Sequence, residues 1–173
     1  PVEVILFILA AVLGAYTGFL LSALISYPML NNPVLPALFL ASGTSSGIAA
    51  TFLFILIAGK LKGDSHESHF IHKFEVPIMV TELGLLVCFF VGLYFGGGQK
   101  VVALQNALSG FWGAVFWIGV FLIGILIPLF ANLAVKDNLK YNKNFIILVS
   151  IFDLIGVLCL RYFILYAGQL TVA

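Results

Sequence analysis

The stretch VILFILAAVLGAYTGFLLSALIS (residues 4–26) decides the class of this fold, because its 23 residues include no charged side chain. An α-helix rises about 1.5 Å per residue, so a helix of this length crosses the roughly 30 Å hydrocarbon core of a bilayer. Four similar stretches follow, at residues 37–59, 74–95, 112–134 and 145–167. Residues 1–173 are therefore predicted to form a single all-α domain, a polytopic transmembrane helix bundle of five spans.

Composition excludes a water-soluble protein. Of the 173 residues, 62% are hydrophobic and 9% are charged, whereas soluble domains hold about 45–50% apolar and about 25% charged residues. The expected surroundings are therefore a lipid bilayer. The net charge of +1 is too small to indicate a nucleic-acid partner. Cys88 and Cys159 lie singly in apolar stretches, so they form neither a CxxC motif nor a disulfide framework.

The start of the chain does not resemble a secretory signal. The first residue is Pro1 rather than Met, and the first apolar stretch is too long for a signal peptide and lacks a basic region before it. We expect the chain to be the mature or cut-down part of a longer polytopic protein.

Lysines are distributed unequally among the loops that join the spans, which predicts an orientation. The loops after the second and fourth spans carry six of them, Lys60, Lys62, Lys73, Lys136, Lys140 and Lys143. The other loops and the C-terminal tail carry only Lys100. Because lysine-rich loops remain in the cytoplasm, the residue 1 side is expected there and the C-terminus on the outer face of the membrane.

Small residues recur along three spans at the spacing of one helix face. They are Ala10, Gly14, Gly18, Ser22 and Ser26 in the first span, Gly43 and Gly47 in the second, and Gly84, Cys88, Gly92 and Gly96 in the third. Such stripes let helix backbones approach closely in a membrane, so they predict tight packing in preference to a substrate-lining surface. Pro128, inside the fourth span, is expected to kink its helix.

The spans lack the usual ligands of redox metals. None contains a histidine, which excludes a bis-histidine haem, and two isolated cysteines cannot hold an iron–sulfur cluster. His66, His69 and His72 have a spacing that can bind zinc, with Glu75 three residues further. They stand in a polar, lysine-flanked loop, which favours a solvated start of the third helix, and no metal site is predicted.

Three carboxylates form a candidate proton path. Glu75 stands at the cytoplasmic start of the third span, and Glu82 lies two helical turns deeper, about 10 Å further along the same face. Asp153 lies about 12 Å into the fifth span, at a comparable depth. The alternatives are a helix-capping role for Glu75 and, for the other two, protonated carboxyl groups that bond to a neighbouring helix.

Arg161, Tyr16 and Thr17 form a candidate quinol-binding set. Arg161 lies about 24 Å from the cytoplasmic start of the fifth span, and the other two lie at a similar height on the first. A phenol hydroxyl can form a hydrogen bond with a quinone oxygen. Alternatively, Arg161 snorkels outward or pairs with a carboxylate, and Tyr16 packs against a neighbouring helix.

Three strings carry a resemblance to a known family. They are LGAYTGFLLSALISYPMLNNPVLPALFLASGTSSGIAA (residues 13–50), FIHKFEVP (residues 70–77) and LRYFILYAGQLTVA (residues 160–173). Over essentially its whole length the chain resembles the NrfD/polysulfide reductase membrane-subunit family. The resemblance implies a fold of eight or more transmembrane helices, of which these would be the last five, and it implies Tyr16 as a quinol contact.

The resemblance also implies a function. Members similar to this chain are haem-free subunits that oxidise menaquinol or ubiquinol as components of a complex and are not catalytic alone. Electrons would pass to a periplasmic iron–sulfur subunit resembling NrfC, then to multihaem cytochromes c and to cytochrome c nitrite reductase, which reduces nitrite to ammonium. Composition alone fits two alternatives equally well, a proton-coupled transporter or channel and a structural membrane anchor for an electron-transfer subunit.

Overall fold

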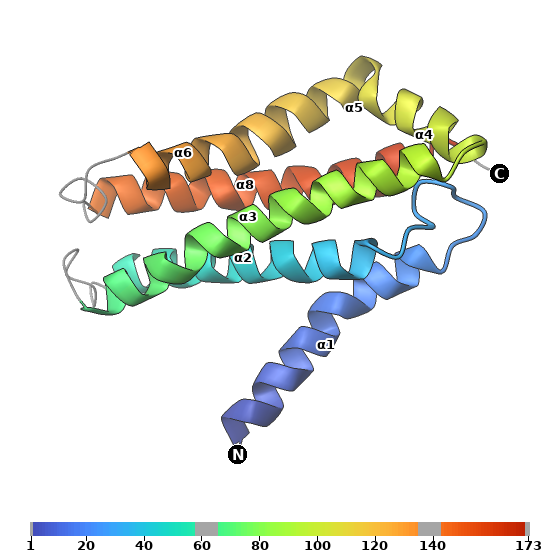
Figure 1. Ribbon diagram of the computed structural model, residues 1–173. Helices are drawn as coiled ribbons and strands as arrows, with labels where there is room; N and C mark the ends of the chain where they lie inside the picture. Colours follow the sequence, from blue (N-terminus) through green and yellow to red (C-terminus); the bar gives the residue numbers. More distant parts are fainter. Residues whose placement is uncertain (1, 58–65, 135–142, 172–173) are drawn as a thin grey trace.

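The computed structural model describes residues 2–57, 66–134 and 143–171, with side chains described for residues 2–57, 75–133 and 144–171. In these residues every regular element is a helix, as the sequence predicts (Figure 1). The order is α1 (Val2–Ser22), α2 (Leu35–Ile57), α3 (His66–Phe95), α4 (Gln99–Leu108), α5 (Gly110–Ala114), the π-helix η1 (Val115–Leu126), α6 (Ile127–Ala134) and α8 (Lys143–Gly168).

Five helical stretches of the described residues are long and apolar enough to cross a membrane, which confirms the predicted polytopic bundle. They are Val2–Ser22, Leu35–Ile57, Glu75–Phe95, Gly110–Leu133 and Asn144–Gly168. The α1 helix ends at Ser22, whereas the predicted span continues to Ser26. It ends early because residues 23–34 leave the helix and turn back into the bundle.

The helix ends gather at two opposite ends of the bundle (Figure 1). The ends of α2 and α6 and the starts of α3 and α8 lie together, and residues 23–34, α4 and the end of α8 lie at the other end. Lys100, on α4, belongs to the second end. The six lysines of the opposite loops fall among residues whose side chains are not described.

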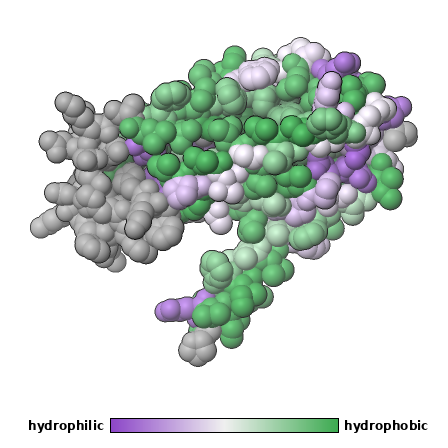
Figure 2. Space-filling model, viewed as in Figure 1, coloured by the Kyte–Doolittle hydropathy of each residue, from purple (hydrophilic) through white to green (hydrophobic). Residues whose placement is uncertain are grey.

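The α1 helix diverges from the other helices, and Figure 2 shows its hydrophobic surface projecting from the bundle. It contacts α2 near its own C-terminal end, where Gly18 is its buried residue. A Cβ added at Gly18 would lie 2.5 Å from the Cα of Pro36, so the two backbones approach as closely as glycine permits. The small-residue stripe of the first span therefore packs α1 onto α2, as predicted, up to Ser22.

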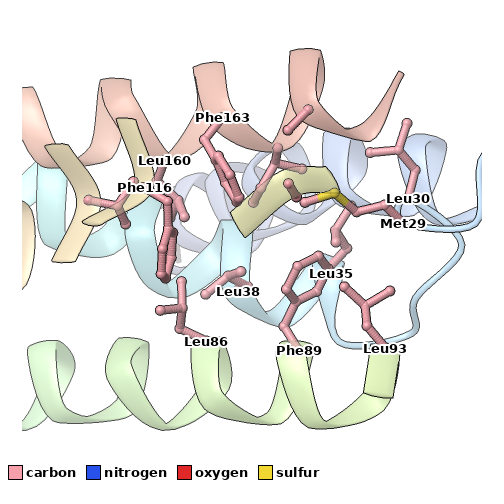
Figure 3. Packing of buried hydrophobic residues seen from close by; sticks show 14 of the residues in the cluster. Met29, Leu30, Leu35, Leu38, Leu86, Phe89, Leu93, Phe116, Leu160 and Phe163 are labelled. Atoms are coloured by element: carbon pink, nitrogen blue, oxygen red, sulfur yellow. The ribbon is translucent and has the colours of Figure 1, made fainter. Parts of the chain in front are cut away.

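The segment between α1 and α2 is non-helical but deeply buried. Met29 and Leu30 are 0% and 1% exposed, in the core between α2, α3 and α8 (Figure 3). The Asn32 side chain bonds to the protein twice, since its Nδ2 donates to the Phe89 carbonyl (3.1 Å) and its Oδ1 accepts from the Val34 N–H (3.0 Å). Non-helical backbone at membrane depth is stable only where protein supplies such partners, so this segment closes one end of the bundle.

The tightest helix contact lies between η1 and α8. Gly124 and Gly156 face each other, and a Cβ added at Gly124 would lie 2.6 Å from the Gly156 Cα. Nearby, a Cβ at Gly119 would lie 2.9 Å from the Cys159 sulfur. In contrast, Gly47 and Gly84 have nothing within 4 Å of a built Cβ among the described residues. Other glycines of the predicted stripes do have close neighbours, since a Cβ at Gly92 would lie 3.3 Å from the Asn32 Nδ2 and one at Gly43 would lie 3.7 Å from an Arg161 nitrogen.

Pro128 lies in α6, directly after a segment of π-helix. The helix before it is a π-helix of 12 residues, Val115–Leu126, in which the Ile127 N–H bonds to the Leu122 carbonyl, five residues back. A proline has no N–H to donate to the carbonyl four residues earlier, so the regular series of α-helical hydrogen bonds is interrupted at Pro128. Because a π turn takes up more residues than an α turn, the side chains after η1 face a different side than in a continuous α-helix.

Candidate functional site

Thr17 and Arg161 lie together, although they come from the first and last helices. They line one cavity of about 230 Å³ with four apolar side chains, Leu20, Leu21, Phe39 and Leu165. The α1–α2 contact at Gly18 brings Thr17 to this position, and the packing of α8 on α2 brings Arg161. The cavity is thus apolar apart from one hydroxyl and one guanidinium group.

The guanidinium of Arg161 is held over an aromatic ring. Its central carbon lies 5.1 Å from the centroid of the Phe39 ring, a cation–π arrangement. A Cβ added at Gly43 would lie 3.7 Å from a guanidinium nitrogen, so this glycine borders the same group. Glu82 is an electrostatic neighbour of Arg161. The half-buried arginine is therefore directed into the bundle.

Tyr16 lies apart from the other two predicted quinol residues. Its side chain is 54% exposed and does not line the cavity that contains Thr17. Consecutive residues of an α-helix point about 100° apart, so a helix that directs Thr17 toward α2 and α8 directs Tyr16 elsewhere. The structure brings Thr17 and Arg161 to one cavity and leaves Tyr16 outside it, although Thr17 and Tyr16 are both exposed on α1.

The three predicted proton-path carboxylates are all buried. Glu75, Glu82 and Asp153 are 6%, 5% and 2% exposed. Asp153 is an electrostatic neighbour of Glu82 and of Glu75, so α3 and α8 hold the three groups near one another. The Ser45 hydroxyl of α2 donates toward both Asp153 oxygens, at 2.9 and 3.0 Å.

Other buried polar residues were not singled out from the sequence. Ser45 is 4% exposed, Ser150 is 2% exposed and Asn132 is 5% exposed. Any polar residue inside a predicted span can signal an internal contact, but the sequence does not show which helix face turns inward. Only the packed helices reveal that these side chains point toward the interior.

The sequence predicts no metal site at the three histidines that begin the third helix. The backbone of His66, His69 and His72 forms the first turns of α3, and their side chains lie outside the described part. Among the residues that are described, no three His, Cys, Asp or Glu side chains are grouped so that they could hold a metal ion.

The family is decided by a match that extends from end to end. The sequence model of the family described as "Polysulphide reductase, NrfD" matches residues 1–173. The chain belongs to the NrfD family.

Three relatives agree with this membership. "Protein NrfD homolog" of Haemophilus influenzae is 90% identical over 173 residues, which cover 100% of this chain and 54% of the relative. "Protein NrfD" of Escherichia coli (strain K12) is 49% identical over 172 residues, 99% of this chain and 54% of the relative. A polypeptide of the polysulfide reductase of Wolinella succinogenes is 42% identical over 172 residues, 98% of this chain and 54% of the relative.

The chain thus spans about half the length of the curated NrfD-family relatives that it matches. No solved structure matches it. Two polar features lie inside the described part of the bundle, the Thr17–Arg161 cavity and the three buried carboxylates, of which Asp153 contacts Ser45.

Proposed function

We propose that this chain is part of a haem-free membrane subunit that oxidises quinol within an oxidoreductase complex. The observation that carries the proposal is the cavity lined by Thr17 and Arg161. Membership of the NrfD family supports an oxidoreductase subunit, and one relative is itself named as part of a polysulfide reductase. An apolar cavity with few polar groups is typical of small-molecule sites in general.

The size of the cavity suits the ring of a quinol rather than the whole molecule. At about 230 Å³ it lies just below the roughly 300–1,000 Å³ of pockets that enclose whole drug-sized ligands. We infer that the ring of menaquinol or ubiquinol enters and that the isoprenoid tail remains in lipid. The four apolar side chains would contact the ring itself, so that Thr17 and Arg161 remain as the polar contacts.

The polar groups suit the chemistry of quinol oxidation. Thr17 can accept a hydrogen bond from one quinol hydroxyl, and Arg161 can donate to a quinol oxygen as it becomes negative. Oxidation to the quinone releases two protons and two electrons from each quinol. Tyr16 is retained as the third proposed contact because of the family resemblance, and it would meet the part of the ring that extends beyond the cavity.

We propose that both electrons pass to an iron–sulfur subunit in the periplasm that resembles NrfC. From there they would reach multihaem cytochromes c and cytochrome c nitrite reductase. The identities of 90% and 49% to proteins named NrfD homolog and NrfD favour this series of acceptors over polysulfide. The lysine distribution supports an inner-membrane location with the residue 1 side in the cytoplasm and the C-terminus in the periplasm.

We further propose that Glu75, Glu82 and Asp153 form a proton path. Buried ionisable groups in a membrane are expensive, and they mark proton relays in many pumps and transporters. Three carboxylates that interact across α3 and α8, with a serine hydroxyl bonded to one of them, support such a relay. The protons released from quinol would leave the path at Glu75, the first residue of its membrane-spanning stretch.

The test is quinol oxidation by the full-length subunit in its complex, reconstituted in proteoliposomes. Arg161→Gln and Thr17→Val are expected to lower kcat/KM for quinol, and Thr51→Val, at an exposed threonine of α2, serves as the matched control. Unchanged turnover in an assembled complex would overturn the site and favour a structural anchor. Flux of a small solute without any electron acceptor would instead favour a transporter.

A further inference from the structure

Asn132 has a side chain that nothing in the proposed function uses. It is 5% exposed, and its Nδ2 has no hydrogen-bond partner among the described residues. A buried amide without a partner is unfavourable by about 1–3 kcal/mol, and in native proteins such groups usually mark a bound water or ion. Because the amide nitrogen is a donor, it calls for an acceptor such as a water oxygen.

The π-helix explains why this polar residue turns inward. Asn132 lies in α6, which directly follows η1, and the extra residues of the π turns rotate all later side chains relative to a continuous α-helix. Apart from η1, the described elements that pack against α6 are α8 and α3. The buried face of α6 therefore faces the two helices that carry the carboxylates.

The register between η1–α6 and α8 locates Asn132 more closely. Gly124 lies against Gly156, and the two helices run in opposite directions (Figure 1). Moving from Gly124 to Asn132 therefore corresponds to moving back along α8 to the turn that contains Val149 and Ser150. Asp153 lies about one helical turn from Val149.

Asn132 also lies at the same end of the bundle as the exit of the proposed path. It is the next-to-last residue of the membrane-spanning stretch Gly110–Leu133, and Glu75 is the first residue of the stretch Glu75–Phe95. Because these stretches run antiparallel, both residues belong to one end of the bundle. Ser150 is also buried, at 2% exposed, about 9 Å into the stretch Asn144–Gly168.

We propose that the Asn132 amide holds a water molecule between α6 and α8, and that this water connects Asp153 to the end of the bundle where α6 ends. The inference rests on the proposed proton path and adds a positioning residue to it. A water needs two to four polar partners, and on these two helices the Asn132 amide would supply a donor and the Asp153 carboxylate an acceptor. The water would relay protons, with Asp153 as the neighbouring ionisable group.

The first measurement is direct. In a cryo-EM map of the full-length complex at a resolution that shows ordered waters, we expect a water within hydrogen-bond distance of the Asn132 Nδ2. A dry contact with apolar side chains, or a direct bond from Nδ2 to a protein group, would overturn the proposal whatever the status of the proton path.

The second measurement tests the role of the water. In proteoliposomes containing the complex, Asn132→Leu is expected to slow the release of quinol protons at the Glu75 end by at least about tenfold, because positioned proton-transfer groups contribute about 10²–10⁴-fold to rates. Asn132→Ser, which keeps a polar partner and leaves room for water, should restore most of the rate. Asn106→Leu, at an amide that bonds to Thr171 at the opposite end, is the control.

The outcomes separate the two proposals. Leucine in place of an unpartnered buried amide is not expected to unfold the protein. If the water is present and Asn132→Leu leaves this proton release unchanged, the role assigned to Asn132 is wrong. If Asp153→Asn also leaves the proton release unchanged, the proton path itself fails, whereas the water would still be seen beside Asn132.

Discussion

The hydroxyl of Ser45 lies within hydrogen-bond distance of both carboxylate oxygens of Asp153, at 2.9 and 3.0 Å. Ser45 belongs to α2 and Asp153 to α8, and both side chains are buried. A polar contact of this kind holds two helices together in a membrane, where apolar burial does not drive their association. It also places a donor on a carboxylate that belongs to the proposed proton path.

Ser45→Ala tests this contact. Loss of the hydroxyl leaves the buried carboxylate without its donor, so we expect the free energy of unfolding to fall by about 1–2 kcal/mol. The measurement is thermal unfolding of the full-length subunit in detergent. The matched control is Ser42→Ala, because the buried Ser42 hydroxyl bonds only within its own helix, to the Phe39 carbonyl (3.2 Å). Equal losses in the two variants would show that the Ser45–Asp153 contact adds nothing.

Gly18→Ala tests the approach of α1 to α2. The added Cβ would lie 2.5 Å from the Cα of Pro36, a backbone atom that cannot move aside alone, so the helices must separate. The neighbouring Thr17 would then shift from the cavity, and we expect kcat/KM for quinol to fall by roughly tenfold or more, since misplacement by about 1 Å can reduce rates about 10²-fold.

Gly14→Ala is the control for this prediction. Its Cβ would meet only the terminal Cδ1 of Leu40, at 3.3 Å, and the flexible leucine is able to adjust. Similar losses in both variants would mean that crowding anywhere along α1 is harmful, and that the specific approach at Pro36 is not what positions Thr17.

Phe39→Leu tests whether the aromatic ring positions Arg161. The guanidinium lies 5.1 Å from the ring centroid, and such cation–π contacts contribute about 0.5–2 kcal/mol. We expect KM for quinol to rise by roughly 3- to 30-fold while the complex remains assembled. Phe54→Leu, at an exposed phenylalanine of the same helix, should leave KM unchanged. A change in kcat alone would argue against a role of Phe39 in quinol binding.

Gly156→Ala tests the closest helix contact. Its Cβ would overlap the Cα of Gly124, so η1 and α8 must move apart, and overpacking of this kind is unfavourable by about 1–3 kcal/mol. We expect lower thermal stability and a lower yield of assembled complex. Gly47→Ala, where a Cβ meets nothing within 4 Å among the described residues, is the comparison. Undiminished stability of the Gly156 variant would contradict the close contact.

Much of the fold could be predicted because the bilayer imposes a local rule. Any helix that crosses about 30 Å of hydrocarbon needs about 20 apolar residues in sequence, so the spans are visible without knowledge of their neighbours. The α2 helix begins at Leu35 and ends at Ile57, within two residues of the predicted span. Residues 23–34 could not be predicted in the same way, because the burial of Met29 and Leu30 depends on three separate helices.

The candidate site could likewise be predicted only in part. The sequence by itself determined that the chain is a membrane bundle and that Thr17, Glu82, Asp153 and Arg161 are polar groups within it, because hydropathy and the cost of a buried charge depend on residue type alone. Only the tertiary structure decided that Thr17 shares a cavity with Arg161 while Tyr16 does not, and that Ser45 bonds to Asp153. These relationships depend on helix rotation and crossing, which close contacts such as Gly18–Pro36 and Gly124–Gly156 establish between residues distant in sequence.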